Sequence, residues 1–306
     1  MRGSLLTVLV IAALVAVGLL GQMGGFGRET PRHEPGRPEP ETPRRPRPDA
    51  APRPDGARPL PPPSTGDPAV DIAVPAEARS STGTAFSLDG RGVWMTARHV
   101  ADGCSRIFVL TGPRVGHLVR GVYIHRTADV AILRTDRGAP HIAFSREEPR
   151  LSQTAYHYGY PKGEPGAVIS TLIGRATMRA RGRYNTNEPV LVWAEKERVP
   201  EGDEHLGGIS GGPVFDATGR VIGTTVAGST RRGRVFTSDM SSIRAALQRA
   251  SVTPAEESSA TLPRPNARNW VEIGSQLRGR LTVAKVVCLV DQQQGWRPRG
   301  TAAPGL

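Results

Sequence analysis

The chain has 306 residues, a formal net charge of +12 at pH 7 and two cysteines. This length allows two ordinary domains or one double-barrel domain with appendages. The two cysteines are far apart and form no Cys-x-x-Cys pair, which excludes the usual zinc and thioredoxin-type sites, and the scattered arginines come without a nucleic-acid-binding motif, so no nucleic-acid partner is expected.

The amino terminus carries a membrane-targeting segment. No charged residue lies between Arg2 and Arg28, and Leu5 to Leu20 is almost wholly apolar. This run lies between the lengths of a signal-peptide core and a membrane anchor. Because no Ala-x-Ala cleavage site follows it, we expect residues 1–27 to be an uncleaved inner-membrane anchor with the rest of the chain in the periplasm. Cleavage, which would leave an exported protein, remains an alternative.

Residues 28–75 form a second region, rich in Pro and Arg and poor in large apolar side chains. Such a segment cannot bury enough apolar surface to fold and is typical of disordered or polyproline-like chain. We therefore predict a linker here, with folded sequence beginning near Ala76.

Residues 76–250 read as short strands separated by turns. A hairpin is predicted from Gly83–Leu88 and Val93–Thr96, with Asp89-Gly90 as its turn. The convincing helix is Ser241–Ala250, with one further turn at Val100–Gly103. Other strands are expected at 106–110, 115–125, 130–134, 154–160, 167–175, 190–194, 214–215, 221–227 and 235–237. Many short strands without long helices indicate a mainly β domain of antiparallel barrels or a sandwich.

Residues 251–306 form a carboxy-terminal extension. Residues 255–269 are polar and contain Pro, which predicts a linker, and residues 281–290 predict one strand. A single strand is not stable alone. We expect it to pair with an edge of the preceding barrel.

The segment Leu206–Phe215 places Ser210 between glycines, with its hydroxyl exposed. This arrangement suits an acyl-transfer nucleophile, because glycine at 208 lets the Gly208 and Ser210 amides point at one spot as an oxyanion hole. The alternative is a Gly-rich turn between strands.

A serine nucleophile needs a base and a group that orients that base. His99 follows an apolar strand at the start of a short turn, and Asp129 opens a buried run, Asp129–Leu133. Taken alone, such a histidine is often structural and such an aspartate is often a cap. Together with Ser210 they predict a His-Asp-Ser triad.

Five segments in this order resemble the successive signatures of trypsin-like serine proteases, most of all those of the bacterial Deg/HtrA-type branch. The resemblance covers roughly residues 80–248. It implies two six-stranded antiparallel barrels with the site between them, His99 and Asp129 coming from the first barrel and Ser210 from the second. The segments are Gly83-Thr-Ala-Phe86, Met95-Thr-Ala-Arg-His-Val100, Ala128-Asp-Val-Ala-Ile-Leu133, Tyr158-Gly-Tyr-Pro161 and Gly208-Ile-Ser-Gly-Gly-Pro-Val214.

Two residues depart from the pattern of that family. Arg98 stands where relatives usually carry Ala or Asn, and Ile209 stands where they carry Asp or Asn. Digestive relatives use the acidic residue to bind a newly freed amino terminus. With Ile209 that ion pair cannot form, so activation by cleavage is not implied, and the resting competence of the loop stays open. A PDZ module, usual in Deg-type proteins, is not visible after the predicted protease region.

The function predicted from these residues is a serine endopeptidase that hydrolyses peptide bonds of envelope proteins, without a metal or another cofactor. Its partners would be a protein or peptide substrate and the membrane that holds the amino-terminal segment. The alternative is a membrane-tethered, non-catalytic binding module on a protease fold, reading peptide or cell-wall material, because a fold does not guarantee a function. The sequence predicts no oligomeric state.

Two further residue assignments remain open. Glu204 lies six residues before Ser210, where trypsin-like relatives place the base of the specificity pocket, although the sequence favours a solvent-exposed Glu in the segment 200–204. Cys104 and Cys288 are expected to form a disulfide in an oxidising compartment. The alternative is two buried free thiols.

Overall fold

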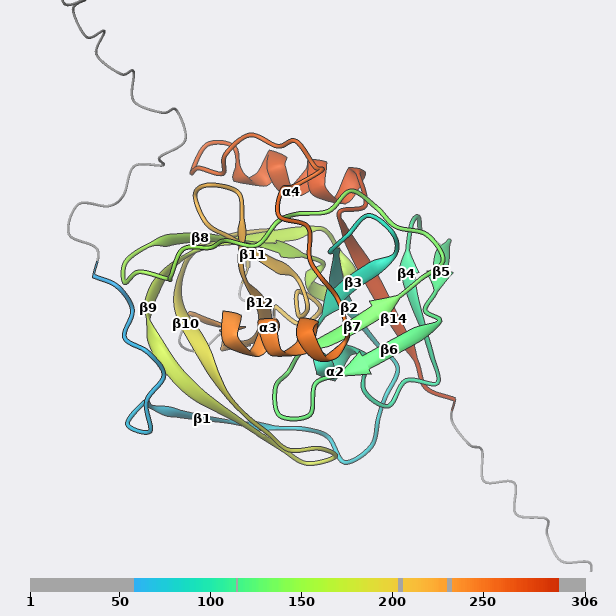
Figure 1. Ribbon diagram of the computed structural model, residues 1–306, viewed down its shortest axis with the longest axis horizontal. Coiled ribbons are helices and arrows are strands. Elements are labelled where there is room, and N and C mark those ends of the chain that lie inside the picture. The colour runs from blue at the N-terminus through green and yellow to red at the C-terminus, as the bar shows by residue number, and fades with distance from the viewer. Residues whose placement is uncertain (1–57, 114, 203–205, 230–232, 292–306) are drawn as a thin grey trace, which may run out of the picture. The chain divides into compact units, whose positions relative to one another are not determined.

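The computed structural model describes residues 58–113, 115–202, 206–229 and 233–291, which form two β-sheets with short helices against them (Figure 1). The first sheet has seven strands in the order β5-β4-β14-β2-β3-β7-β6. Its strands are β2 Ser81–Ser87, β3 Val93–Thr96, β4 Arg106–Leu110, β5 Gly116–Leu118, β6 Gly121–Ile124, β7 Ala131–Arg134 and β14 Val283–Leu289.

The second sheet also has seven strands, in the order β1-β9-β10-β13-β12-β11-β8. An additional pairing of β9 with β8 closes six of these strands into a ring, and β1 adds to the outside of β9 as a parallel strand. The strands are β1 Ala69–Ala73, β8 Thr154–Gly159, β9 Gly166–Arg181, β10 Thr186–Val199, β11 Pro213–Phe215, β12 Val221–Ser229 and β13 Arg234–Ser238.

The helices are short. They are α2 Arg98–Ala101, the 3-10 turn η1 Pro161–Gly163, α3 Met240–Arg249 and α4 Trp270–Gly279. Helix α3 begins at Asp239, whose carboxylate accepts a hydrogen bond from the Ser241 amide at 2.8 Å, as an N-cap should. It packs against β7 of the first sheet and β12 of the second, whereas α4 packs against β8, β9 and β14.

One apolar cluster joins the two sheets. Phe86 and Ile132 of the first sheet lie in the same cluster as Phe215 of the second, with Ile243 of α3 and Trp270 of α4. All five side chains are almost fully buried. Since burying a large apolar side chain contributes about 1.5–3 kcal/mol, this shared cluster holds the sheets together.

The predicted hairpin and most predicted strands are present, and the mainly β fold with two sheets is confirmed. The turn at Asp89-Gly90 is held by the Asp89 carboxylate, which accepts hydrogen bonds from the Arg91 and Val93 amides at 2.8 and 3.2 Å. The first sheet differs from the predicted six-stranded barrel, because β14 inserts as a seventh strand between β4 and β2.

The predicted linker over residues 28–75 is wrong at its carboxy-terminal end. Strand β1 lies inside it, with Val70 and Ile72 half-buried against an apolar cluster, and Leu60 is 9% exposed. Composition alone missed this strand, because one extended segment of alternating exposure needs few apolar residues when an edge of a sheet is available. Residues 28–57 lie outside the described part of the chain.

The carboxy-terminal extension also differs from the prediction. Helix α4 was not expected, although Trp270, Ile273 and Leu277 repeat at helical spacing and are all buried. The predicted strand over 281–290 exists as β14, but it lies inside the first sheet rather than at an edge. The predicted anchor over residues 1–27 lies outside the described residues, among which no helix is long and apolar enough to span a membrane.

Candidate active site

His99 and Asp129 are brought together where the neighbouring antiparallel strands β3 and β7 meet, at the end of β3 and the start of β7. His99 lies in α2, directly after β3, and Asp129 precedes β7. The His99 amide donates to Asp129 Oδ1 at 2.8 Å, and His99 Nδ1 lies 2.7 Å from Asp129 Oδ2. The aspartate is 5% exposed, whereas the imidazole retains 35% exposure. This pair of bonds fixes both the backbone and the ring of His99.

The electrostatics of this pair suit a base that must accept a proton. Burial of the imidazole opposes its protonation, but the charge and hydrogen bond of Asp129 outweigh burial and raise the pKa of His99 above its ordinary value. The Arg183 charge acts in the opposite direction. An imidazolium formed during a reaction would therefore be stabilised by Asp129.

Ser210 lies in a loop of the second sheet that Thr84 of β2 holds from the first sheet. The Thr84 amide donates to the Ser210 carbonyl at 2.8 Å, and Thr84 Oγ1 donates to the Gly208 carbonyl at 2.7 Å. Among the described residues neither the Gly208 amide nor the Ser210 amide donates a hydrogen bond.

Two positions in this loop require glycine. Gly208 has φ +98°, and a Cβ there would lie 2.4 Å from the Tyr160 carbonyl oxygen. Gly211 has φ +87°, and a Cβ there would lie 2.3 Å from Thr96 Oγ1 and 2.9 Å from the Ala97 amide nitrogen. The loop thus packs against the segment that leads into His99. Within the described chain no hydrogen bond joins the Ser210 hydroxyl to His99, and catalytic bonds of this kind often tighten only when substrate binds.

Residues 83–223 match the family described as "Trypsin-like peptidase domain". The chain carries a trypsin-like peptidase domain. This match confirms the resemblance predicted from the sequence motifs at the level of the family, and with it the mainly β, chymotrypsin-like fold.

The peptidase domain is similar to other proteins that have been characterised to different degrees. "Uncharacterized protein y4bJ" of Sinorhizobium fredii (strain NBRC 101917 / NGR234) is 30% identical over 173 residues, which cover 56% of this chain and 26% of that protein. The chain thus spans about a quarter of the length of that curated relative.

Solved structures with similarity include the active form of the Rv3671c protease from M. tuberculosis, at 20% identity and a TM-score of 0.47, covering 62% of this chain and 85% of that one. The HtrA-type protease AlgW with decapeptide has 21% identity and a TM-score of 0.43, covering 55% of this chain and 51% of that one. The MamO protease domain from Magnetospirillum magneticum has 15% identity and a TM-score of 0.40, covering 56% of this chain and 95% of that one.

In this peptidase domain Ile209 is 2% exposed and belongs to an apolar cluster with Leu206 and Trp193. An apolar side chain therefore occupies the place where digestive relatives keep a carboxylate. Glu204, the candidate base of the specificity pocket, lies outside the described residues.

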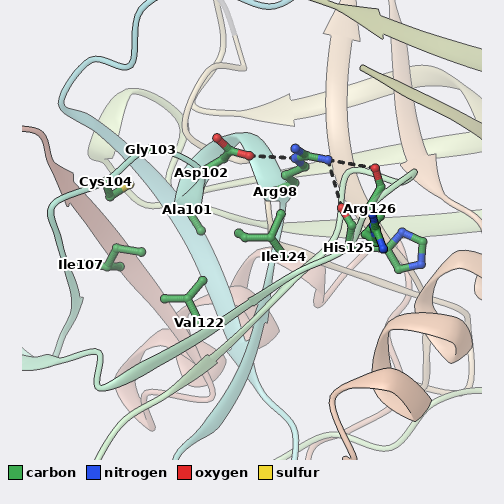
Figure 2. A pocket seen from close by; sticks show the side chains of 10 residues that line it. All are labelled: Arg98, Ala101, Asp102, Gly103, Cys104, Ile107, Val122, Ile124, His125 and Arg126. Atoms are coloured by element: carbon green, nitrogen blue, oxygen red, sulfur yellow. Dashed lines mark hydrogen bonds and ion pairs between the residues drawn. The ribbon is translucent and has the colours of Figure 1, made fainter. Parts of the chain in front are cut away.

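Arg98, noticed in the sequence only as a departure, connects several segments around His99 and Asp129. Its Nε donates to Asp102 Oδ2 at 2.9 Å, and its Nη1 donates to the carbonyls of His125 and Arg126 at 3.0 and 3.1 Å. Its guanidinium carbon also lies 3.9 Å from the centre of the Tyr184 ring. Figure 2 shows the first three of these contacts at an open cavity.

These contacts join three parts of the peptidase domain. Arg98 and Asp102 belong to α2 and its end, the two carbonyls precede Asp129 in the β6–β7 connection, and Tyr184 lies in the turn between β9 and β10. Arg98 therefore ties the segment of the histidine and the segment of the aspartate to the second sheet. One signal of this role is visible in the sequence, a long forked cation directly before the histidine.

Cys104 and Cys288 are joined by a disulfide. Cys104 follows α2, and Cys288 lies in β14, where it is paired with Ile107 of β4 and Ser81 of β2. Both cysteines of the chain are thus used, and the bond ties the carboxy-terminal strand to the segment after His99.

Proposed function

We propose that the chain is a serine endopeptidase that uses His99 as general base and acid, Asp129 as the residue that orients it, and Ser210 as nucleophile. The observation that carries this proposal is the pair of hydrogen bonds between His99 and Asp129, of 2.8 and 2.7 Å. This pair leaves Nε2 of the imidazole available on the side away from Asp129.

In this mechanism His99 Nε2 takes the proton from the Ser210 hydroxyl as Ser210 Oγ attacks the carbonyl carbon of a peptide bond. The tetrahedral intermediate collapses when the imidazolium gives its proton to the leaving amine, which breaks the C–N bond and leaves an acyl-serine. Water, deprotonated by the same imidazole, then hydrolyses the ester. Asp129 remains ionised throughout and stabilises the imidazolium.

The oxyanion of each tetrahedral intermediate would be bound by the amides of Gly208 and Ser210. Thr84 supports this role, because it binds the carbonyl of each of these two residues from the first sheet. Donors that are already oriented need no reorganisation when charge develops, and one such donor typically contributes about 2.7–4 kcal/mol of transition-state stabilisation.

We further propose that the substrates are proteins or peptides of the cell envelope and that residues 1–27 hold the protease domain at the membrane, with the domain in the periplasm. The uncharged, apolar amino-terminal sequence supports this placement. The disulfide also supports it, since such bonds persist in oxidising compartments.

A fluorophosphonate probe tests the proposed activity. We expect it to label the full chain at Ser210, with labelling abolished in Ser210→Ala and reduced by orders of magnitude in His99→Ala. Casein hydrolysis should follow the same order, because the triad acts as a unit. Absence of labelling in a folded chain that still binds peptide would support the non-catalytic binding module instead.

A further inference from the structure

A second buried carboxyl group lies beside the backbone of Asp129. Glu188, near the start of β10, is 2% exposed. Its Oε1 accepts a hydrogen bond from the Asp129 amide at 2.6 Å, and its Oε2 accepts one from the Ser238 hydroxyl at 3.1 Å. The backbone of Asp129 is therefore held by a side chain of the second sheet.

A second bond between the same two segments lies beside this one. The Asn187 amide donates to the Thr127 carbonyl at 3.1 Å. Residues 127–129 of the first sheet's β6–β7 connection are thus fastened to residues 187–188 of β10 by a backbone bond and a side-chain bond. Both oxygens of the Asp129 carboxylate are already used by His99, so Glu188 supplies the support for its main chain.

We propose that Glu188 is a positioning residue that fixes the backbone of Asp129 and so keeps the Asp129 carboxylate aligned with His99. This role rests on the proposed function. Removing the acceptor would leave the Asp129 amide buried without a partner, a loss that a neighbouring backbone bond cannot replace. Glu188 acts through Asp129 and does not contact substrate.

The charges around Glu188 favour the neutral form. Burial first, and then the charge of Asp129, raise the pKa of Glu188 to about 8, against the opposing hydrogen bonds from the Asp129 amide and from Ser238 and Ser242. Two neighbouring elements present hydroxyl groups to Glu188, Ser238 from β13 and Ser242 from α3. The nearby carboxylate of Asp239 is ion-paired with Arg175 of β9. A buried carboxyl group beside the charge of another carboxylate ionises less readily, so Glu188 keeps its proton near neutral pH.

Three variants of the full chain test this role. Glu188→Gln keeps an acceptor for the Asp129 amide without a charge, Glu188→Leu removes it, and Glu197→Gln is the control, because Glu197 is an exposed residue of the same strand. At pH 7 we expect fluorophosphonate labelling of Ser210 in Glu188→Gln and Glu197→Gln to be within about threefold of the wild-type rate. Glu188→Leu should be slower by at least about tenfold, through kcat rather than KM in peptide hydrolysis.

Rescue by glutamine separates positioning from simple filling of the core, since leucine also fills the site. Equal labelling rates in Glu188→Leu and the wild type would overturn the positioning role. A tenfold loss in Glu188→Gln at pH 7 would overturn the neutral form. If circular dichroism shows that Glu188→Leu does not fold, Glu188→Gln and Glu188→Met carry the same comparison.

Thermal unfolding gives a readout that does not depend on catalysis. A carboxyl group that keeps its proton in the folded state but loses it on unfolding destabilises the fold progressively as the pH rises from its ordinary pKa to its raised one. The Tm of Glu188→Gln minus that of the wild type should therefore rise by at least about 3 °C between pH 5 and 8 and level off above. A flat difference would overturn the neutral form. If the wild type fails to label while this difference still rises, the peptidase proposal fails and the protonation of Glu188 stands.

Discussion

The two sheets of this domain each gain a strand from outside the predicted protease region of residues 76–250, but at different places. Strand β14, from the carboxy-terminal side, lies between β4 and β2 inside the first sheet. Strand β1, from the amino-terminal side, pairs with β9 alone at the outside of a ring that β8 and β9 already close. One added strand is internal and the other is peripheral.

The sheet bearing His99 and Asp129 therefore depends on distant sequence, whereas the sheet bearing Ser210 is closed by the consecutive strands β8 to β13. Without β14, facing edges of β2 and β4 would lose their hydrogen-bond partners, and an unpaired edge is open to aggregation. Without β1, one edge of β9 is exposed but the ring persists. The segments that carry the proposed base and orienter therefore rely on β14, which begins some sixty positions after the end of the matched residues 83–223.

The largest effect is expected from ending the chain after residue 281, which removes β14. Val283, Val286 and Cys288 are all buried, so the first sheet would lose a central strand, part of its core and its disulfide. We expect this chain to be insoluble or unfolded by circular dichroism and unable to label with a fluorophosphonate. A chain ending after Asp291 keeps β14 and should behave as the full chain does. A soluble, labelling chain without β14 would contradict the dependence described above.

The second-largest effect is expected from removing the side chain of Arg98, which contacts segments of both sheets beside His99 and Asp129. Arg98→Ala removes the bonds to Asp102 and to the carbonyls of His125 and Arg126, as well as the contact with Tyr184. Hydrogen bonds to charged groups contribute about 1.5–3 kcal/mol each. Part of this loss lowers the free energy of unfolding, and the rest lowers the catalytic rate. We expect kcat to fall about 10–100-fold with KM little changed.

Two comparisons sharpen the test of Arg98. The Arg91→Ala variant, at a position whose side chain is 83% exposed, should keep full activity. Guanidinium ion should partly restore Arg98→Ala, because Arg98 lines an open cavity through which it can enter (Figure 2). Unchanged kcat in Arg98→Ala would show that the aspartate and histidine segments do not need this tie.

Much of this arrangement could be predicted from the sequence, because local patterns encode it. The Asp89-Gly90 turn, the strand after Asp129 and the glycines around Ser210 each follow from residue types within a few positions. The places of β14 and Glu188 could not be predicted in this way. A strand pattern does not name its partner, and a glutamate before an apolar strand looks exposed until the fold buries it beside Asp129.

Strand β1 was missed for a related reason. The sequence around Ala69–Ala73 follows a Pro-rich stretch, and its two half-buried side chains are too few to indicate a core. Its place depends on the length of β9, which continues to Arg181, well beyond the predicted end near Arg175. A long neighbouring strand supplies the edge on which a weak strand pattern can settle.

A smaller effect, on stability rather than on activity, is expected from the disulfide. Replacing Cys104 and Cys288 by Ala together removes a closure of 184 residues. Loss of a native disulfide typically lowers the free energy of unfolding by about 2–5 kcal/mol. Since β14 keeps its ladder with β2 and β4, we expect near-normal activity at 25 °C. Urea unfolding should show a lower midpoint with a steeper slope, because the denatured chain without the cross-link exposes more surface. Reduction of the wild type should reproduce this change, and an unchanged midpoint would mean that the ladder alone holds β14.

The smallest effect is expected from starting the chain at residue 76 instead of residue 58, which removes β1 and Leu60. The lost pairing of β1 with β9 and the lost burial of Leu60 are largely offset by the conformational entropy that an ordered edge segment regains. We expect the free energy of unfolding to fall by about 1–3 kcal/mol, with kcat/KM within about twofold. Urea unfolding of the two chains, with peptide hydrolysis at 25 °C alongside, measures both quantities. A loss of activity as severe as that on removing β14 would show that the second sheet is not self-sufficient, because an edge strand would then be as necessary as an internal one.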